Sequence, residues 1–361
     1  MKNIIKTAIV MLSSLSLFTS VNAGELSVTG TAKATYNILS GHSQNVGKGM
    51  GVANEFNLGA SGELDNGYTW GYNIAFDPNN TAGGTNGEVQ NDDSSLTLTT
   101  PQGTVGVFIK TGGLDVEDGA SQSVYGRPTD IGDPSATVDN WTIDSYNSFQ
   151  YHSPAGLLPF GLAAKVAYAP SLDGNQNSAN ATPAGAATDL TTSMGSSATE
   201  MQIKAAPIDG LAIGASYISF DNSGTNDSGN GALLKQSPES GAVYASYTQG
   251  PASVGYSRAK AASLLSTATL TDTTAEFYDQ TNMSIAYNVN DALSVSYEIE
   301  ESIAEYVTAA TASIKSESDA IQAAYTMGGM TLAVSYAKHD NFGYVLNQDA
   351  SQALFAVSMA F

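Results

Sequence analysis

The chain has no cysteine, few charges and no long apolar run beyond its first segment. With no cysteine among 361 residues, neither a disulfide framework nor a thiolate metal site can form, and three histidines leave little scope for imidazole chemistry. Charged residues make up 13% of the sequence, about half of the ~25% typical of soluble domains. After residue 23 no stretch approaches the ~18 consecutive apolar residues of a helical membrane span. Since 9% of the residues are aromatic and alternate with polar ones, disorder is excluded too, which leaves a large all-β protein.

The first 23 residues have the pattern of a secretory signal peptide. Lys2 and Lys6 precede an apolar run over 8–18, and small residues stand at Val21 and Ala23. The alternative, a membrane anchor helix, needs a longer apolar core. Cleavage would leave residues 24–361 and, by removing two lysines and no acid, change the net charge from −21 to −23. Such a polyanion repels nucleic acid, so we expect no nucleic-acid partner.

From Glu25 onward the sequence alternates with a period of two, which predicts β-strands with one apolar and one polar face. In 25–38 the even positions run from Leu26 to Ile38 and are apolar or small, whereas the odd positions are all polar. Seven short, turn-rich connections such as 65–67 and 207–210 alternate with eight long ones, which implies sixteen strands in a single domain. The long ones fall near 40–52, 78–92, 112–145, 170–196, 222–237, 261–275, 302–316 and 340–350. In the first of these we expect the glycine-rich 47–51 to be flexible loop.

The fold predicted is a closed, 16-stranded antiparallel transmembrane β-barrel. A soluble β-sandwich also alternates, but it rarely needs sixteen strands with every long connection on one edge. In a barrel the apolar face meets membrane lipid and the polar face lines a lumen. Tyrosines on the apolar face near strand ends are typical of interfacial aromatic girdles: Tyr36, Tyr68, Tyr168, Tyr217, Tyr247, Tyr256, Tyr287, Tyr297, Tyr325 and Tyr336.

With its leader, its alternating strands, its long third connection and a last strand that ends in Phe361, the chain resembles the general porins of Gram-negative outer membranes. The resemblance covers the whole mature chain and is architectural, since no catalytic or binding motif supports it. It implies a passive channel for small hydrophilic solutes and ions, assembled as a homotrimer. It also implies that the third connection folds inward, and that Phe361 is the signal read by the outer-membrane assembly machinery.

The expected constriction loop, 112–145, is strongly acidic. Against a single base, Arg127, it holds Asp115, Glu117, Asp118, Asp130, Asp133, Asp139 and Asp144. These carboxylates are either ordinary solvated loop acids or project into the lumen. Strand parity turns further charges inward, namely the bases Lys33, Lys110, Lys165 and Lys204 and the acids Glu55, Glu63, Glu200, Glu298 and Glu300. The excess of acids predicts a weak preference for cations.

Other functions find less support in the sequence, and nothing in it indicates a cofactor. The leading alternative is a structural or adhesive outer-membrane protein whose long loops bind a surface or a partner. Hydrolase chemistry is disfavoured, because His152 and Ser153 are adjacent on a strand and point to opposite faces. Asp115, Glu117 and Asp118 are spaced suggestively for calcium but lack the full Asp-rich loop pattern. Arg258 shares the outward parity of Tyr256, so we expect it to lie above the hydrocarbon or to follow a β-bulge.

Overall fold

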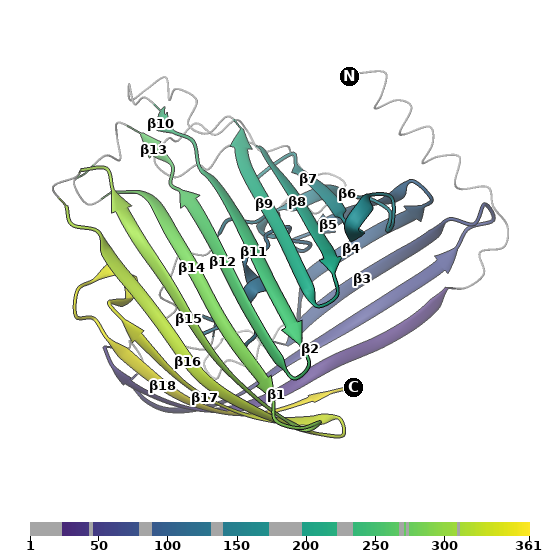
Figure 1. Ribbon diagram of the computed structural model, residues 1–361. Helices are drawn as coiled ribbons and strands as arrows, with labels where there is room; N and C mark the ends of the chain where they lie inside the picture. The colour runs from purple at the N-terminus through teal and green to yellow at the C-terminus, as the bar shows by residue number, and fades with distance from the viewer. Residues whose placement is uncertain are drawn as a thin grey trace.

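The computed structural model describes residues 24–42, 46–78, 89–130, 140–172, 197–221, 234–266, 271, 274–308 and 311–361. Sixteen antiparallel strands form one closed barrel, as the alternation predicted (Figure 1). They are β1 (Glu25–Gly41), β2 (Gly47–Glu63), β3 (Thr69–Pro78), β4 (Val89–Thr100), β5 (Gly103–Ile109), β6 (Asn147–His152), β7 (Ala163–Ala169), β8 (Ser197–Ile208), β9 (Leu211–Asp221), β11 (Glu239–Gln249), β12 (Ala252–Ala262), β14 (Ala275–Asn288), β15 (Leu293–Tyr306), β16 (Ile314–Met327), β17 (Met330–Asp340) and β18 (Ala350–Ala360). Among the residues described, no helix is long and apolar enough to cross a membrane.

Two features of the connections differ from the sequence prediction. The predicted long connections 222–237 and 261–275 contain the short strands β10 (Leu234–Gln236) and β13 (Leu265–Ser266), which pair with each other in a separate sheet. The prediction of flexible loop at 47–51 was wrong, because β2 already begins at Gly47, opposite Leu39 of β1. Backbone hydrogen bonds to β1 hold this segment, and they do not depend on side chains.

The barrel closes between its first and last strands. Tyr36 of β1 lies opposite Phe355 of β18, and the register continues without a bulge along the pair. Beyond β18, the backbone of Phe361 exchanges two hydrogen bonds with that of Gly30, at 2.8 and 3.0 Å. The Phe361 ring lies 5.6 Å from that of Phe56 on the outer wall. The barrel therefore has no free strand edge, as a structure within lipid requires.

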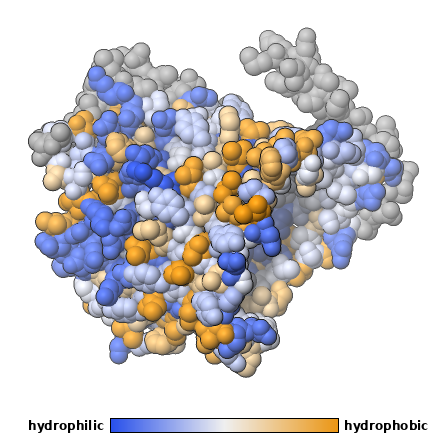
Figure 2. Space-filling view, viewed as in Figure 1, coloured by the Kyte–Doolittle hydropathy of each residue, from blue (hydrophilic) through white to orange (hydrophobic). Residues whose placement is uncertain are grey.

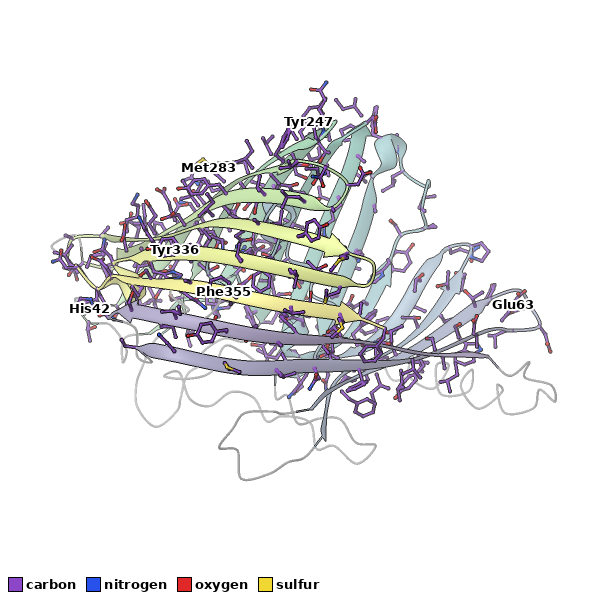
Figure 3. All side chains as sticks on the ribbon, turned by 90° about the horizontal axis from the view of Figure 1, so that it is seen from below. His42, Glu63, Tyr247, Met283, Tyr336 and Phe355 are labelled. Atoms are coloured by element: carbon purple, nitrogen blue, oxygen red, sulfur yellow. The ribbon has the colours of Figure 1, made fainter. Side chains whose placement is uncertain are left out.

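The two faces of the wall have opposite chemistry. Large apolar side chains such as Tyr247, Met283, Tyr336 and Phe355 point outward (Figure 3) and remain exposed by 37–50%. Serine, glutamine, asparagine and glutamate side chains dominate the inner face, and many of them are buried. An apolar exterior around a polar interior is the reverse of a soluble protein and fits a wall that faces lipid.

The connections define two different ends of the barrel. Figure 3 shows His42, after β1, and Glu63, at the end of β2, at opposite ends of the strands. Turns of a few residues join strands at the Glu63 end, where Gly67, Gly210 and Gly328 have positive φ angles of 80°, 77° and 61°. The long connections emerge at the other end. These ends are called the turn end and the loop end below.

Charged side chains on the outer wall gather near the loop end of β12 and β14–β16. Arg258 donates two hydrogen bonds to Asp279, at 3.0 and 2.6 Å, and Lys315 contacts Glu301 at 2.7 Å. Figure 2 shows hydrophilic residues among apolar ones over β14–β16, on the left of the view. Arg258 faces outward with no bulge between β12 and β14, one outward position nearer the loop end than Tyr256. The register therefore excludes the expected β-bulge, and Arg258 stands opposite the outward Val243 of β11. This ionic belt comprises Arg258, Lys260, Asp279, Glu301, Lys315 and Glu317.

Candidate functional site

The connection between β5 and β6 enters the barrel and lies against its inner wall. Its described parts are 110–130 and 140–146, which carry the short 3-10 helices η2 (Glu117–Ala120) and η3 (Ile143–Ser145). Helix η2 contacts β11, β12 and β14, and η3 contacts β6, β7 and β8. The third long connection is thus an inward-folded loop that narrows the lumen. It is called the constriction loop below.

Glu200 of β8 holds the two ends of the constriction loop together. Its carboxylate accepts hydrogen bonds from the backbone amides of Ile143 at 2.8 Å and Leu114 at 3.3 Å. The neighbouring Gln202 donates to the carbonyl of Leu114 at 2.8 Å. Both wall side chains are almost completely buried. One strand of the wall therefore fixes the entry and the exit of the loop.

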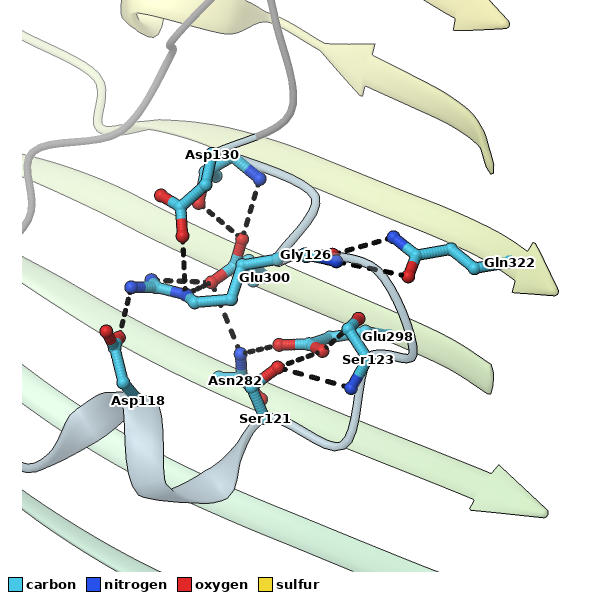
Figure 4. Close-up of polar contacts among 11 residues, drawn as sticks. Asp118, Ser121, Ser123, Gly126, Asp130, Asn282, Glu298, Glu300 and Gln322 are labelled. Atoms are coloured by element: carbon cyan, nitrogen blue, oxygen red, sulfur yellow. Dashed lines mark hydrogen bonds and ion pairs between the residues drawn. The ribbon is translucent and has the colours of Figure 1, made fainter. Parts of the chain in front are cut away.

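Two glutamates of β15 hold the middle of the loop (Figure 4). The Ser121 and Ser123 hydroxyls donate to the Glu298 carboxylate at 2.6 and 2.5 Å. Two steps along the strand, Glu300 accepts from the Arg127 guanidinium at 2.6 Å. It also accepts from the backbone amide and the hydroxyl of Thr129, at 2.9 and 2.5 Å. Charge-assisted hydrogen bonds of this kind are the stronger ones in proteins.

Beyond Glu300, Gln322 of β16 holds the next part of the loop. Its amide group donates to the carbonyl of Gly126 at 2.6 Å and accepts from the amide of Tyr125 at 3.0 Å. The Tyr125 ring packs on small inward residues of β16–β18, and the Lys33 ammonium lies 5.3 Å from its centroid. The residues under Val124 and Tyr125 are Ala320, Ala324, Ala333, Ala337, Leu354 and Ala356. The loop therefore follows the wall from β8 to β18.

Gly255 of β12 lets the backbone of the loop approach the wall closely. A Cβ atom built on Gly255 would lie only 1.7 Å from the carbonyl oxygen of Ala120. The same loop turn presents Gly119 to the Tyr244 ring, 2.6 Å from where a Cβ would stand. Neither these two glycines nor the alanines under Tyr125 were predicted from the sequence as parts of the site. The sequence does contain a clue to them, because small residues recur at inward strand positions where polar residues were expected.

The acids predicted for the constriction loop have different environments. Glu117 is buried, and this burial, with Asp115 nearby, raises its pKa to about 7. Asp118 forms an ion pair with Arg127, and Asp130 lies 4.0 Å from the same guanidinium. Burial nevertheless raises the pKa of Asp118. The predicted acids Asp133 and Asp139 lie outside the described residues, as does the predicted signal peptide.

Asp115 and Asp144 form the acidic surface of the loop near η3. Their carboxylates lie within 2.8 and 3.0 Å of the position of a Cβ on Gly113, and both are half-buried. Burial, with the charge of Asp115, raises the pKa of Asp144. Among the residues described, no group of three or more histidines or acids is placed to hold a metal ion, which includes the suggested calcium ligands.

The inward acids of the wall divide into two sets. Glu200, Glu298 and Glu300 face inward, as the alternation predicts, but the constriction loop covers them. They hold the loop against the wall. Glu55 and Glu63 of β2 lie on the opposite part of the wall and are exposed.

Three of the four predicted basic residues lie at inward positions of strands, whereas Lys110 follows its strand with a positive φ of 51°. Lys33 belongs to β1, Lys165 to β7 and Lys204 to β8, while Lys110 follows β5 directly. Within the part of the chain that the structure describes, none of the four forms an ion pair. The bases on β7 and β8 stand beside the loop, so the lumen has fixed charge of both signs.

Among the described residues, neither His152 nor His339 forms a hydrolase site with the serine beside it. His152 contacts Gln150 through Nε2 at 2.9 Å, whereas the Ser153 hydroxyl accepts from the amide of Ala164. His339 does contact Ser318, at 2.8 Å, but both side chains are almost completely buried and no substrate could reach them.

Comparison with known proteins identifies the fold. No protein-family profile matches the sequence, and no curated protein matches it. Solved structures do match over nearly the whole chain. The outer membrane channel DcaP of Acinetobacter baumannii has a TM-score of 0.64 at 12% identity, covering 95% of this chain and 99% of that one. An anion-selective porin from Comamonas acidovorans has 0.62 at 10%, covering 94% and 100%. OmpF of Salmonella typhi, in complex with daunomycin, has 0.61 at 14%, covering 94% and 98%. The chain has the porin fold.

Proposed function

We propose that this chain is an outer-membrane porin, a water-filled channel for the passive diffusion of small hydrophilic solutes and ions. The observation that carries the proposal is the constriction loop, pinned to one side of a polar inner wall by Glu200, Glu298 and Glu300. A closed barrel with an apolar exterior solves the problem of crossing lipid. A loop held inside it by charge-assisted hydrogen bonds sets a fixed aperture, which a purely structural barrel does not need. The protein acts as a channel and not as an enzyme.

In this proposal the turn end faces the periplasm and the loop end faces the outside. Residues 1–23 direct secretion, Phe361 is read by the assembly machinery, and three copies form a homotrimer. Limited proteolysis of intact cells tests the orientation. Protease should cleave within 178–190 and spare 207–210, since only the former would be accessible from outside. Cleavage confined to 207–210 would reverse the orientation.

Conductance of the purified protein in a planar lipid bilayer tests the channel itself. Stepwise increases of current with ohmic behaviour support the proposal, because a fixed aqueous passage conducts in proportion to voltage. Folded protein that inserts and gives no conductance would contradict it, and would favour the adhesive alternative. Heat-dependent mobility in gels provides the check that the barrel is folded.

The proposed pore prefers cations weakly. In this proposal the half-buried Asp115 and Asp144 border the lumen together with the exposed Glu55 and Glu63, whereas Glu117 is buried and the loop covers Glu200, Glu298 and Glu300. In a passage no wider than the Debye length of ~8–10 Å such charges are only partly screened. The double change Asp115→Asn with Asp144→Asn should move the zero-current potential in a salt gradient toward anions, more so in dilute salt. Glu117→Gln is the matched control and should shift the zero-current potential little. An equal shift in both variants would contradict the view that Asp115 and Asp144 border the lumen while Glu117 does not.

A further inference from the structure

Three basic side chains lie together on the inner wall of β6, β7 and β8. His152 stands directly opposite Lys165 in the register of β6 and β7. Lys165 is opposite Gln202 of β8, and Lys204 is the next inward residue of that strand. Lys165 and Lys204 are therefore diagonal neighbours on one face, a separation that long side chains span. The three residues are called the basic triad below.

The basic triad has no acid among the described residues to balance it. Among the same residues Lys33 and Lys110 form no ion pair either, but they lie apart, on β1 and just after β5, whereas the triad brings its members together on neighbouring strands. Arg127 in the lumen is paired with Glu300, and Arg258 and Lys315 on the outer wall are paired with carboxylates. The ammonium groups of Lys165 and Lys204 carry the same charge and repel each other. An anion that binds between them from solution would offset this repulsion, so its binding is favourable.

The surroundings of the basic triad are held in place. Gln150 donates through Nε2 to the carbonyl of Gly112 at 2.7 Å and to the hydroxyl of Ser148 at 3.1 Å. Its Oε1 is thus left to accept from His152 Nε2 at 2.9 Å, which fixes the imidazole. The Phe108 ring packs beside His152, with 5.7 Å between centroids.

The other side of the triad is bounded by an aromatic ring. Lys204 lies opposite Gly214 of β9. A Cβ on Gly214 would lie 2.4 Å from the Tyr244 ring, so this ring covers the glycine. Lys165 is half-buried, and Lys204 is exposed to the lumen. The triad lies toward the turn end of these strands, beside Gln202, which binds the constriction loop.

We propose that Lys165 and Lys204, bordered by His152, form a subsite for the anionic group, a carboxylate or a phosphate, of a small solute that passes the constriction. The subsite rests on the proposed channel function and adds a chemical class of solute to it. Ammonium groups act as strong point-charge donors to either oxyanion. A solute group bound here would lie next to the loop and leave the acidic surface at Asp115 and Asp144 free for cations. Both signs of small ion can then use the same passage.

Concentration-dependent block of the single-channel current tests the subsite. Inorganic phosphate and, separately, acetate are added to the KCl current at pH 7 and constant ionic strength. The wild-type channel should show saturable block or flicker by at least one probe, and the probe effective at the lower concentration identifies the preferred oxyanion. In the double variant Lys165→Gln with Lys204→Gln the half-blocking concentration should rise at least ~10-fold, since a subsite loses both ammonium donors.

The matched control is Lys110→Gln with Lys33→Gln, which removes the same charge outside the basic triad. This control should keep the half-blocking concentration within about twofold of wild type. An equal loss in both double variants would mean that a diffuse field acts rather than a site. A wild-type channel that conducts without saturable block would overturn the subsite and leave the channel proposal standing. Folded protein without any conductance would overturn both.

Discussion

Replacing Glu300 by glutamine should release the middle of the constriction loop without unfolding the barrel. One oxygen of Glu300 faces two nitrogens of Arg127, each at 2.6 Å, and the other faces the amide and hydroxyl of Thr129. Every partner is a donor. In Glu300→Gln the new NH2 group must therefore face a donor on one side, and the charge that Arg127 needs is lost.

The size of the effect follows from the burial of this pair. The side chains of Arg127 and Glu300 are 13% and 6% exposed, so water replaces little of what is lost. Removing one partner of a buried ion pair costs ~3–5 kcal/mol. We expect the low end of this range, because Asp118 still forms an ion pair with Arg127 in the variant. A local change of ~3 kcal/mol is a factor of roughly 100 in the opening of the segment, at ~1.4 kcal/mol per factor of ten.

Amide hydrogen exchange measures this opening directly. Exchange of the Thr129 amide and of the peptide over 121–130 should be roughly 100-fold faster in Glu300→Gln, while the strands keep their protection. Glu55→Gln is the matched control, because Glu55 is an exposed inward acid whose carboxylate accepts from Asn57 and holds no loop residue. Exchange within threefold of wild type in Glu300→Gln would refute the view that this carboxylate anchors the loop. Larger current noise in the bilayer should accompany the opening.

Three further predictions concern assembly, packing and pH. Deleting Phe361 should reduce insertion into the outer membrane far more than deleting Ser223, as measured by folded protein per cell, because only the former removes backbone pairs and a ring at the closing strand; equal insertion would count against it. Gly255→Ala should displace η2 and change the single-channel conductance without changing the amount of folded barrel, since its Cβ would overlap a loop carbonyl. Unchanged conductance would show that this close contact does not set the position of η2. Glu117 has a pKa raised by burial to about 7, so its protonated form favours the docked loop, and docking should weaken as pH rises from about 4.5 to 7. Glu117→Gln should flatten this dependence in hydrogen exchange over 114–121, and an unaltered pH profile would assign it to another group.

The barrel could be predicted from the sequence because its signal is repeated along the chain. Each strand alternates over many residues, and the period of two assigns every side chain to the lipid or the lumen. Closure follows from an even strand number and from the alternating connection lengths. The segment 47–51 was misread because its glycines give no alternation, although backbone pairing with β1 makes it a strand.

The constriction could be predicted only in part. Parity placed Glu298 and Glu300 on the inner side, but an exposed pore-lining acid and an acid buried under a loop have the same parity. The difference lies in which residues meet across the lumen, such as Ser123 with Glu298, 175 positions apart in the sequence. Local patterns carry no information on such pairs. The inward alanines beneath Tyr125 were the best available clue to the path of the loop.

The anchoring of the constriction loop has a consequence for the order of folding. Its partners lie far along the chain, at Glu200 of β8, Glu298 of β15 and Gln322 of β16, up to 197 residues from the loop residues that they bind. Closing such long stretches of chain is slow and needs the wall to exist first. The loop can therefore dock only after β15 and β16 have joined the growing sheet. A barrel that has not reached this stage has a wide, unobstructed interior, so the aperture is among the last features of the molecule to form.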